Sequence, residues 1–262
     1  MTTKYMFSKK RMKKLLFIIG LFFLFNNAFS ANVDSLFMKA NENYSQDLYT
    51  NATELYLQII DQGYESPEVY YNLGNCYFKS NNIPSAILYY EKAKKLKPND
   101  EDIEFNLKVA NTKIVDKIEP VPELFFWQWW RSIYNVFGAD TWAKIGVGGF
   151  ILFFIMLAFY LLSKQTLIRK TAFYTGVVIF IITLFTIAVG YQKYKLLKSE
   201  NEAIVFTPTI TVKSSPNQNS VDLFVIHEGS KVKIVEKVGG WYEIKIANGS
   251  VGWLPASSLK DI

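Results

Sequence analysis

Two long runs without a charged residue constrain this chain more than any other feature. The first covers residues 145–162 and the second residues 171–191. Each is near the length that a helix needs to cross about 30 Å of hydrocarbon. We therefore predict two transmembrane helices, at residues 144–163 and 171–191, which together form a hairpin.

The connector between the two runs is short and basic. It carries Lys164, Arg169 and Lys170 and no acidic residue. Short loops rich in lysine and arginine are typical of the cytoplasmic side of a membrane. We therefore predict a cytoplasmic loop at residues 164–170. Two crossings return the chain to the side from which it started, so the segments before and after the hairpin share one compartment.

The N-terminus has the layout of a secretory signal peptide. A basic cluster is followed by the apolar run 15–25 and then by the small residues Ala28 and Ser30. We predict a signal peptide at residues 1–30; an uncleaved anchor is the alternative. Six basic residues and no acidic one lie in this segment, which accounts for the whole formal net charge of +6. Because the rest of the chain is neutral, we expect no nucleic-acid partner.

Cysteine and histidine are too scarce for most metal and catalytic sites. Cys76 and His227 are the single residues of their types. They exclude an intrachain disulfide and the ligand set of a structural zinc site, so we expect no metal and no cofactor. We interpret Cys76 as a buried structural thiol and His227 as an exposed residue beside a turn. No phosphate loop or nucleophile motif is present, and we expect no enzyme.

Between the signal peptide and the hairpin, large and small residues alternate in the pattern of two packed helices. The pattern comprises Tyr70, Leu73, Gly74, Tyr77, Ala86, Tyr90, Ala93 and Pro98. The small residues let two antiparallel helices approach closely, the large ones fill the groove, and the proline stops the second helix. This segment resembles a tetratricopeptide repeat.

The flanks of this repeat extend the same architecture. A looser copy precedes it, in which Asn41 stands near the position of Gly74. A capping helix is expected at residues 102–117, with Ile114 on its apolar face. We predict an all-α repeat domain at residues 31–120.

Peptide binding by such a repeat uses the concave side, which the first helix of each pair lines. Four side chains of that helix point away from the packed ridge. Our candidates for protein binding are Tyr71, Asn75, Phe78 and Lys79.

An aromatic segment lies directly before the first hydrophobic run. Residues 125–130 read Phe-Phe-Trp-Gln-Trp-Trp, and Trp142 follows close behind. Because amphipathic rings prefer the headgroup layer of a membrane, we predict an interfacial helix within residues 121–143. An aromatic platform for a ligand is the alternative.

Beyond residue 200 the chain changes to short alternating runs separated by glycine and proline. We predict strands at residues 204–206, 211–213, 223–226, 232–235, 241–246 and 251–254. The order Lys213-Ser214-Ser215-Pro216, Gly240-Trp241-Tyr242 and Gly252-Trp253-Leu254 resembles the bacterial SH3 domain. We predict a linker and a small all-β barrel at residues 192–262. Bacterial SH3 domains bind cell-wall peptides or act as protein adaptors, so Tyr242 is a candidate contact residue. One or both tryptophans are expected to fill the interior.

The whole order of segments resembles the E-type protein of the Bacteroides aerotolerance (Bat) operon. The resemblance implies an inner-membrane protein with periplasmic domains. It also implies partners among membrane proteins with von Willebrand A domains and a MoxR-type ATPase, in envelope stress or aerotolerance. We hypothesise a non-enzymatic scaffold that binds protein partners through both soluble domains. The alternative is a tether or wall sensor that binds peptidoglycan through the SH3-like domain.

Overall fold

The computed structural model describes residues 32–119, 121–122, 124–198 and 201–262. The signal peptide predicted at residues 1–30 lies outside them. The chain forms two compact units, the first ending at Asn82 and the second beginning at Ile83.

The first unit consists of helices. Residues 32–45 are helical, and α2 (Tyr49–Asp61) and α3 (Pro67–Lys79) follow and pack together. The start of α3 is fixed locally, because the Ser66 hydroxyl accepts a hydrogen bond from the Val69 N–H at 3.1 Å and proline occupies the first helical position. The first predicted repeat is therefore helical, and so is the first half of the second, which is α3.

The second unit begins with two packed helices, α4 (Ile83–Leu96) and α5 (Glu101–Asn111). The Asp100 carboxylate caps α5 by accepting hydrogen bonds from the N–H groups of Asp102 and Ile103, both at 3.1 Å. The prediction of a capping helix that continues to residue 117 is wrong, since α5 ends at Asn111.

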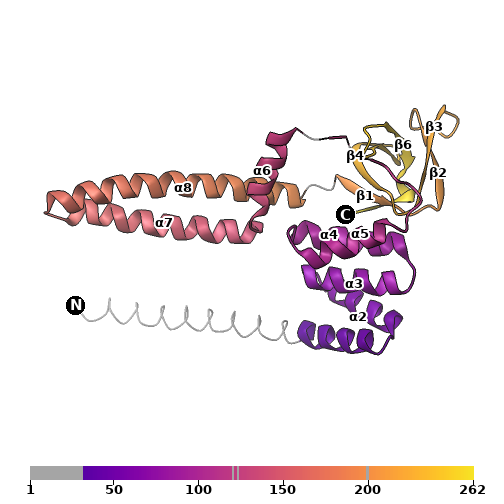
Figure 1. The fold of residues 1–262 in the computed structure, drawn as a ribbon, viewed down its shortest axis with the longest axis horizontal. Coiled ribbons are helices and arrows are strands. Elements are labelled where there is room, and N and C mark those ends of the chain that lie inside the picture. The colour runs from indigo at the N-terminus through magenta and orange to yellow at the C-terminus, as the bar shows by residue number, and fades with distance from the viewer. Residues whose placement is uncertain (1–31, 120, 123, 199–200) are drawn as a thin grey trace, which may run out of the picture. The chain divides into compact units, whose positions relative to one another are not determined.

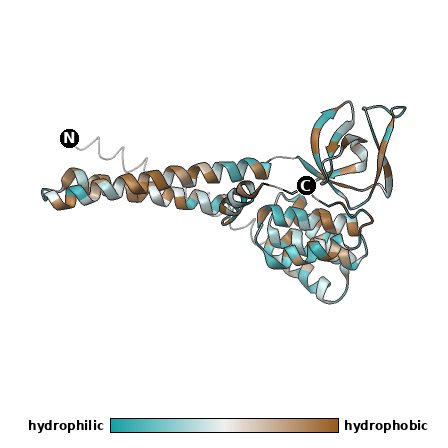
Figure 2. Ribbon diagram, turned by 45° about the horizontal axis from the view of Figure 1, so that its top comes forward, coloured by the Kyte–Doolittle hydropathy of each residue, from teal (hydrophilic) through white to brown (hydrophobic). Residues whose placement is uncertain are grey.

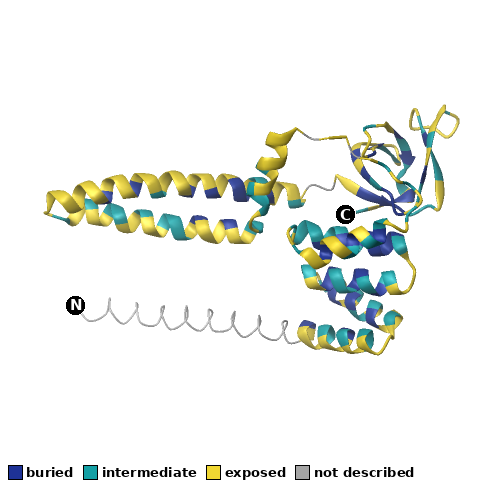
Figure 3. Ribbon diagram, in the orientation of Figure 1, coloured by how far each residue is buried: buried dark blue, intermediate teal, exposed yellow. Residues whose placement is uncertain are grey.

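Three further helices make up the apolar part of the second unit. Helix α6 (Phe125–Asn135) precedes α7 (Ala139–Leu162) and α8 (Thr166–Lys198), and α7 and α8 lie side by side as a hairpin (Figure 1). Both helices of the hairpin are long and apolar enough to cross a membrane. Hydrophobic residues dominate their length (Figure 2), and most of their surface is exposed (Figure 3).

Small residues bring α7 and α8 together. A Cβ atom at Gly146 would lie 3.1 Å from Ile187 Cγ1, one at Gly190 would lie 3.1 Å from Trp142 Cβ, and one at Gly149 would overlap the Thr183 hydroxyl. The large side chains point outward instead. This arrangement is typical of helices that pack within a bilayer, where close backbone approach supplies the van der Waals contact.

The C-terminal part of the second unit, residues 202–262, is called the β domain below. Its strands are β1 (Glu202–Val205), β2 (Thr209–Lys213), β3 (Asp222–His227), β4 (Lys231–Val238), β5 (Trp241–Lys245), β6 (Val251–Pro255) and β7 (Leu259–Asp261). They form one antiparallel sheet in the order β3-β2-β6-β5-β4-β1-β7. The sequence indicates the first six strands. The three-residue strand β7, which pairs with β1 after a 3-10 turn, is missed.

Alternation along the strands builds the core of the β domain. Val212, Ile226, Ile244 and Leu254 are fully buried at the centre of its hydrophobic cluster. Gly252 on β6 is paired with Ile244 and packs on Val212, and a side chain there has no room. A Cβ atom there would lie 2.5 Å from Val212 Cγ1 and 2.9 Å from the backbone oxygen of Lys213.

We expect Gly252→Ala to destabilise the β domain by about 1–2 kcal/mol, because overpacking against backbone cannot be relieved by a rotamer change. Val251→Ala is the matched control, since the Val251 side chain is 41% exposed on the other face of the same strand, and it should stay within about 0.5 kcal/mol of the parent. Urea unfolding, monitored by hydrogen exchange of the amides in the β domain, measures the free energy of unfolding of both variants. Equal effects of the two substitutions would contradict the role given to Gly252.

Candidate binding surfaces

The four candidate residues of the repeat lie on α3. Tyr71, Asn75 and Phe78 are half-buried and Lys79 is exposed, whereas Leu73 and Cys76 on the other side of the helix are fully buried. The helical spacing places the four on one face. Peptide binding by this face stays a prediction.

A polar cluster inside the first unit was missed by the sequence analysis. The Asn41 side-chain oxygen accepts hydrogen bonds from the Tyr56 hydroxyl and from the Asn72 amide, the latter at 3.1 Å. Burial raises the pKa of Tyr56 far above its ordinary value. The signal for this cluster is Asn41 at the position where the second repeat has glycine, because a polar residue at a packed position needs partners.

Cys76 behaves as a structural residue. Its side chain is fully buried, and burial raises the pKa of the thiol to about 11. At neutral pH the group is therefore protonated, and a thiol reacts far more slowly than a thiolate. This agrees with the prediction of a buried thiol.

The tryptophans of the β domain do not fill its interior, so that prediction is wrong. Trp241 and Trp253 are half-buried and lie outside the buried core cluster. The register explains this, because Trp253 pairs with Lys213 and Glu243, whose side chains alternate with core residues on their strands. Tyr242 packs against the core instead, with the Lys237 ammonium 4.7 Å from its ring centre.

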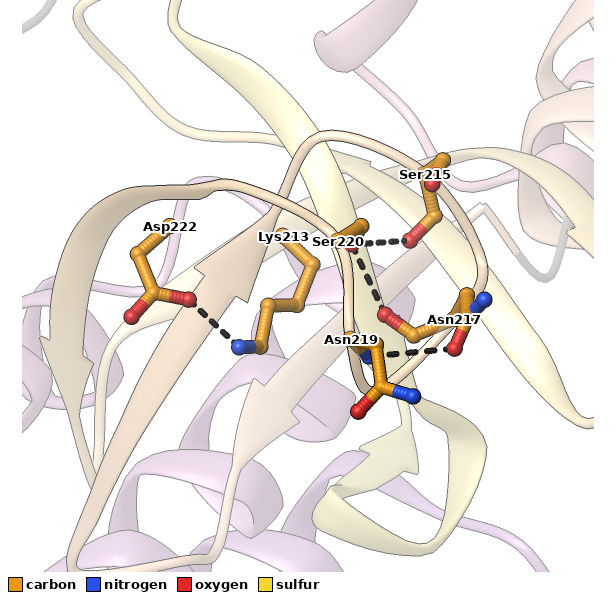
Figure 4. Close-up of polar contacts among 6 residues, drawn as sticks. All are labelled: Lys213, Ser215, Asn217, Asn219, Ser220 and Asp222. Atoms are coloured by element: carbon orange, nitrogen blue, oxygen red, sulfur yellow. Dashed lines mark hydrogen bonds and ion pairs between the residues drawn. The ribbon is translucent and has the colours of Figure 1, made fainter.

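The loop between β2 and β3 is ordered by its own polar groups (Figure 4). Ser220 donates to the backbone oxygens of Ser215 and Asn217, at 3.0 and 2.7 Å, and the Asn219 N–H donates to the Asn217 side chain at 3.0 Å. Lys213 and Asp222 form an ion pair at the base of the loop. The loop thus presents a preformed rim beside the outward-facing Trp253, to which Lys213 is paired.

The chain after α5 contacts the β domain through Asp116. Its carboxylate accepts hydrogen bonds from the His227 N–H and the Ser230 hydroxyl, both at 2.7 Å, and lies 2.8 Å from His227 Nδ1. The prediction that His227 is an exposed polar residue is therefore wrong. Burial acts to raise the pKa of Asp116, but the hydrogen bonds from Ser230 and His227 outweigh it and hold the pKa below its ordinary value.

Further contacts surround this carboxylate. Ile114, predicted as part of the capping helix, packs on the turn at Gly229, where a Cβ atom would lie 2.5 Å from Ile114 Cγ2. The Val121 N–H donates to the backbone oxygen of Ala247 at 3.1 Å. We call residues 114–121 the docking segment; position 120 is not described.

An ion-pair network links α4 to the β domain as well. The Lys231 ammonium lies 3.0 Å from the Glu91 carboxylate and 2.9 Å from that of Glu202. Burial acts to lower the pKa of Lys231, but the two carboxylates outweigh it and raise the pKa. Residues that precede the hairpin in sequence are thus bound to residues that follow it.

Comparison with known families identifies one segment on each side of the hairpin. A tetratricopeptide repeat model matches residues 67–100, and a bacterial SH3 domain model matches residues 208–260. No curated protein matches the chain. The protein therefore combines a tetratricopeptide repeat region, two helices apolar enough to cross a membrane and an SH3-like domain. Both families are typically non-catalytic binding modules, the first for proteins and the second for proteins or cell wall.

Metal ligands do not gather in the described part of the chain, where no three His, Cys, Asp or Glu side chains come together as a site would require.

Proposed function

We propose that this protein is a non-enzymatic scaffold of the bacterial inner membrane, which binds protein partners through its repeats and its SH3-like domain. One observation carries the proposal: a single chain joins two families of binding modules to two helices that are apolar enough to anchor them. The aromatic helix α6 would lie in the headgroup layer.

The contacts of the docking segment support a two-pass topology. Asp116 and Ser230 are hydrogen-bonded, and the hairpin lies between them in sequence. Two segments in contact occupy one compartment, so an even number of crossings separates them. With an exported first segment, that compartment is the periplasm. The even number of crossings is argued here without the signal peptide, whereas the assignment to the periplasm still depends on it.

Partners among membrane proteins with von Willebrand A domains and a MoxR-type ATPase, and a role in aerotolerance or envelope stress, are proposed on the resemblance in segment order alone. The repeat face of Tyr71, Asn75 and Phe78 is the surface that we propose for them. Lys79 and Tyr242 are proposed as further contacts.

Crosslinking and affinity purification of the full-length protein from its native membrane test the scaffold. We expect membrane proteins with von Willebrand A domains to co-purify, and a variant with alanine at Tyr71, Asn75 and Phe78 to lose them by at least tenfold. A variant with alanine at the exposed residues Glu54 and Gln58 of α2 is the control and should retain them. Recovery that is the same in both variants would overturn the assignment of this face.

Binding of peptidoglycan by the SH3-like domain is the second candidate. The outward Trp253 beside the ordered β2–β3 loop favours it, because a ring held at the surface can contact a ligand. Sedimentation of the full-length protein with purified sacculi tests this, with Trp253→Ala as the variant and Val251→Ala as the control. The full chain is needed, since the docking segment is bound to the β domain.

A further inference from the structure

Aromatic side chains of α6 are exposed although the helix is held in place. Phe125, Trp127 and Trp129 are 82%, 56% and 67% exposed. The helical period places Phe125 and Trp129 on one side of α6, and places Trp127 on the side of Trp130 and Tyr134, which are half-buried. A soluble helix would turn such rings inward, so the exposed ones face a medium other than bulk water.

Three contacts fix α6 at the open end of the hairpin, the end opposite the 163–165 turn. The Trp130 and Phe185 rings lie 6.3 Å apart between centres and nearly perpendicular. The Asn135 side-chain oxygen accepts a hydrogen bond from the Lys193 ammonium at 2.6 Å. The Trp142 indole N–H donates to the backbone oxygen of Tyr134 at 3.3 Å. The Phe125 and Trp129 rings thus point away from α8, and Trp127 lies one turn before the ring that contacts it.

Positive charge gathers at the same end. Lys144 on α7 and Lys195 and Lys198 on α8 are exposed there, and Asp140 is the single acidic residue between residues 124 and 198. Lys193 is engaged by Asn135 and is 5% exposed, so it holds the corner together rather than facing a ligand. On these helices the three exposed lysines therefore outnumber the acidic residues, of which there is one.

We propose that the exposed rings of α6 and the lysines Lys144, Lys195 and Lys198 form a collar that binds the headgroups of anionic phospholipids. The inference rests on the membrane anchorage proposed above and adds a lipid class to it. Rings at the headgroup level bind the interface without selecting charge. Each lysine near an anionic surface contributes about 1 kcal/mol of attraction, so the lysines supply the selectivity.

Quenching of tryptophan fluorescence by brominated lipids tests the collar. Four of the six tryptophans lie at this end, at positions 127, 129, 130 and 142, and the other two lie in the β domain. The full-length protein is placed in vesicles of phosphatidylcholine and phosphatidylglycerol, with either lipid brominated. We expect brominated phosphatidylglycerol to quench more strongly than the same fraction of brominated phosphatidylcholine.

The variants separate the collar from general anchorage. With glutamine at Lys144, Lys195 and Lys198, the preference for phosphatidylglycerol should fall by about fivefold or more. The control carries glutamine at Lys164, Arg169 and Lys170 at the turn end, where no tryptophan reports, and should keep the preference. Equal quenching by both lipids in the parent, or an unchanged preference in the collar variant, overturns the collar alone. Quenching by neither lipid overturns the membrane anchorage with it.

Discussion

Gly149→Leu will force the two helices of the hairpin apart. A Cβ atom at this position already overlaps the Thr183 hydroxyl and lies 3.3 Å from Thr183 Cβ. Rotation of the threonine away from this position would break the hydrogen bond that its hydroxyl donates to the Ile179 backbone oxygen at 2.8 Å. We expect a loss of about 3 kcal/mol in the stability of the helix pair.

Thermal unfolding of the detergent-solubilised protein measures the effect. Disulfide formation between cysteines placed at Met156 and Gly176 gives a second readout of helix packing. A Cβ atom at Gly176 would lie 3.4 Å from Met156 Cβ, close to disulfide geometry, so the bond should form less readily when the helices are forced apart. Gly148→Leu is the matched control, since nothing lies within 4 Å of its Cβ position. If the adjacent glycines respond alike, the helices do not pack through Gly149.

Asp116→Ala will release the docking segment from the β domain. The substitution leaves the His227 N–H and the Ser230 hydroxyl without the acceptor that now bonds both. Hydrogen bonds to a charged group are worth about 1.5–3 kcal/mol each, and partial exposure of the site reduces their sum, so we expect a loss of about 3 kcal/mol. Hydrogen exchange at the His227 amide reports the opening directly.

Asp222→Ala is the control for this substitution. Its carboxylate is also paired, with Lys213, but is 65% exposed, and exposed ion pairs contribute little. We expect a change within about 0.5 kcal/mol and no faster exchange at His227. A loss in Asp116→Ala as small as that in Asp222→Ala would show that Asp116 acts as an ordinary surface carboxylate.

The contribution of Asp116 will depend on pH. Its pKa is lower in the folded protein than in the unfolded chain, where it is about 3.9. The unfolded state therefore binds the proton more tightly, and the stabilisation is complete above the unfolded pKa and is lost as pH falls through the folded pKa. The stability difference between the parent and Asp116→Ala should be full at neutral pH and should shrink below about pH 4. A difference that is constant down to strongly acid pH would contradict this.

Local patterns predicted most of the fold. The hairpin follows from two charge-free runs, the repeat from residues such as Gly74 and Ala86, and six strands from alternation. Each of these signals is contained within a few tens of residues. Strand β7 was missed because three residues after a turn carry no period, and its place is fixed by pairing with β1.

The errors share one cause, which is contact between segments distant in sequence. Ile114 fits the apolar face of a longer α5, and only the packing of Gly229 on it shows why the helix ends before it. His227 has no local partner, since Asp116 is 111 residues away. The outward direction of Trp253 depends on the register of β6 against β2, which the sequence of a single strand does not determine.

The docking segment makes the β domain a discontinuous folding unit. Ile118 packs against the core that β1–β7 build, yet it leaves the ribosome before the hairpin, whereas every strand leaves after it. The segment therefore meets its partner only after both helices of the hairpin have been synthesised. The packed hairpin already holds its two ends side by side. Contact between the docking segment and the β domain therefore requires little further loss of chain entropy. In the membrane topology proposed above, the β domain can therefore assemble only when both flanks of the hairpin lie on one side.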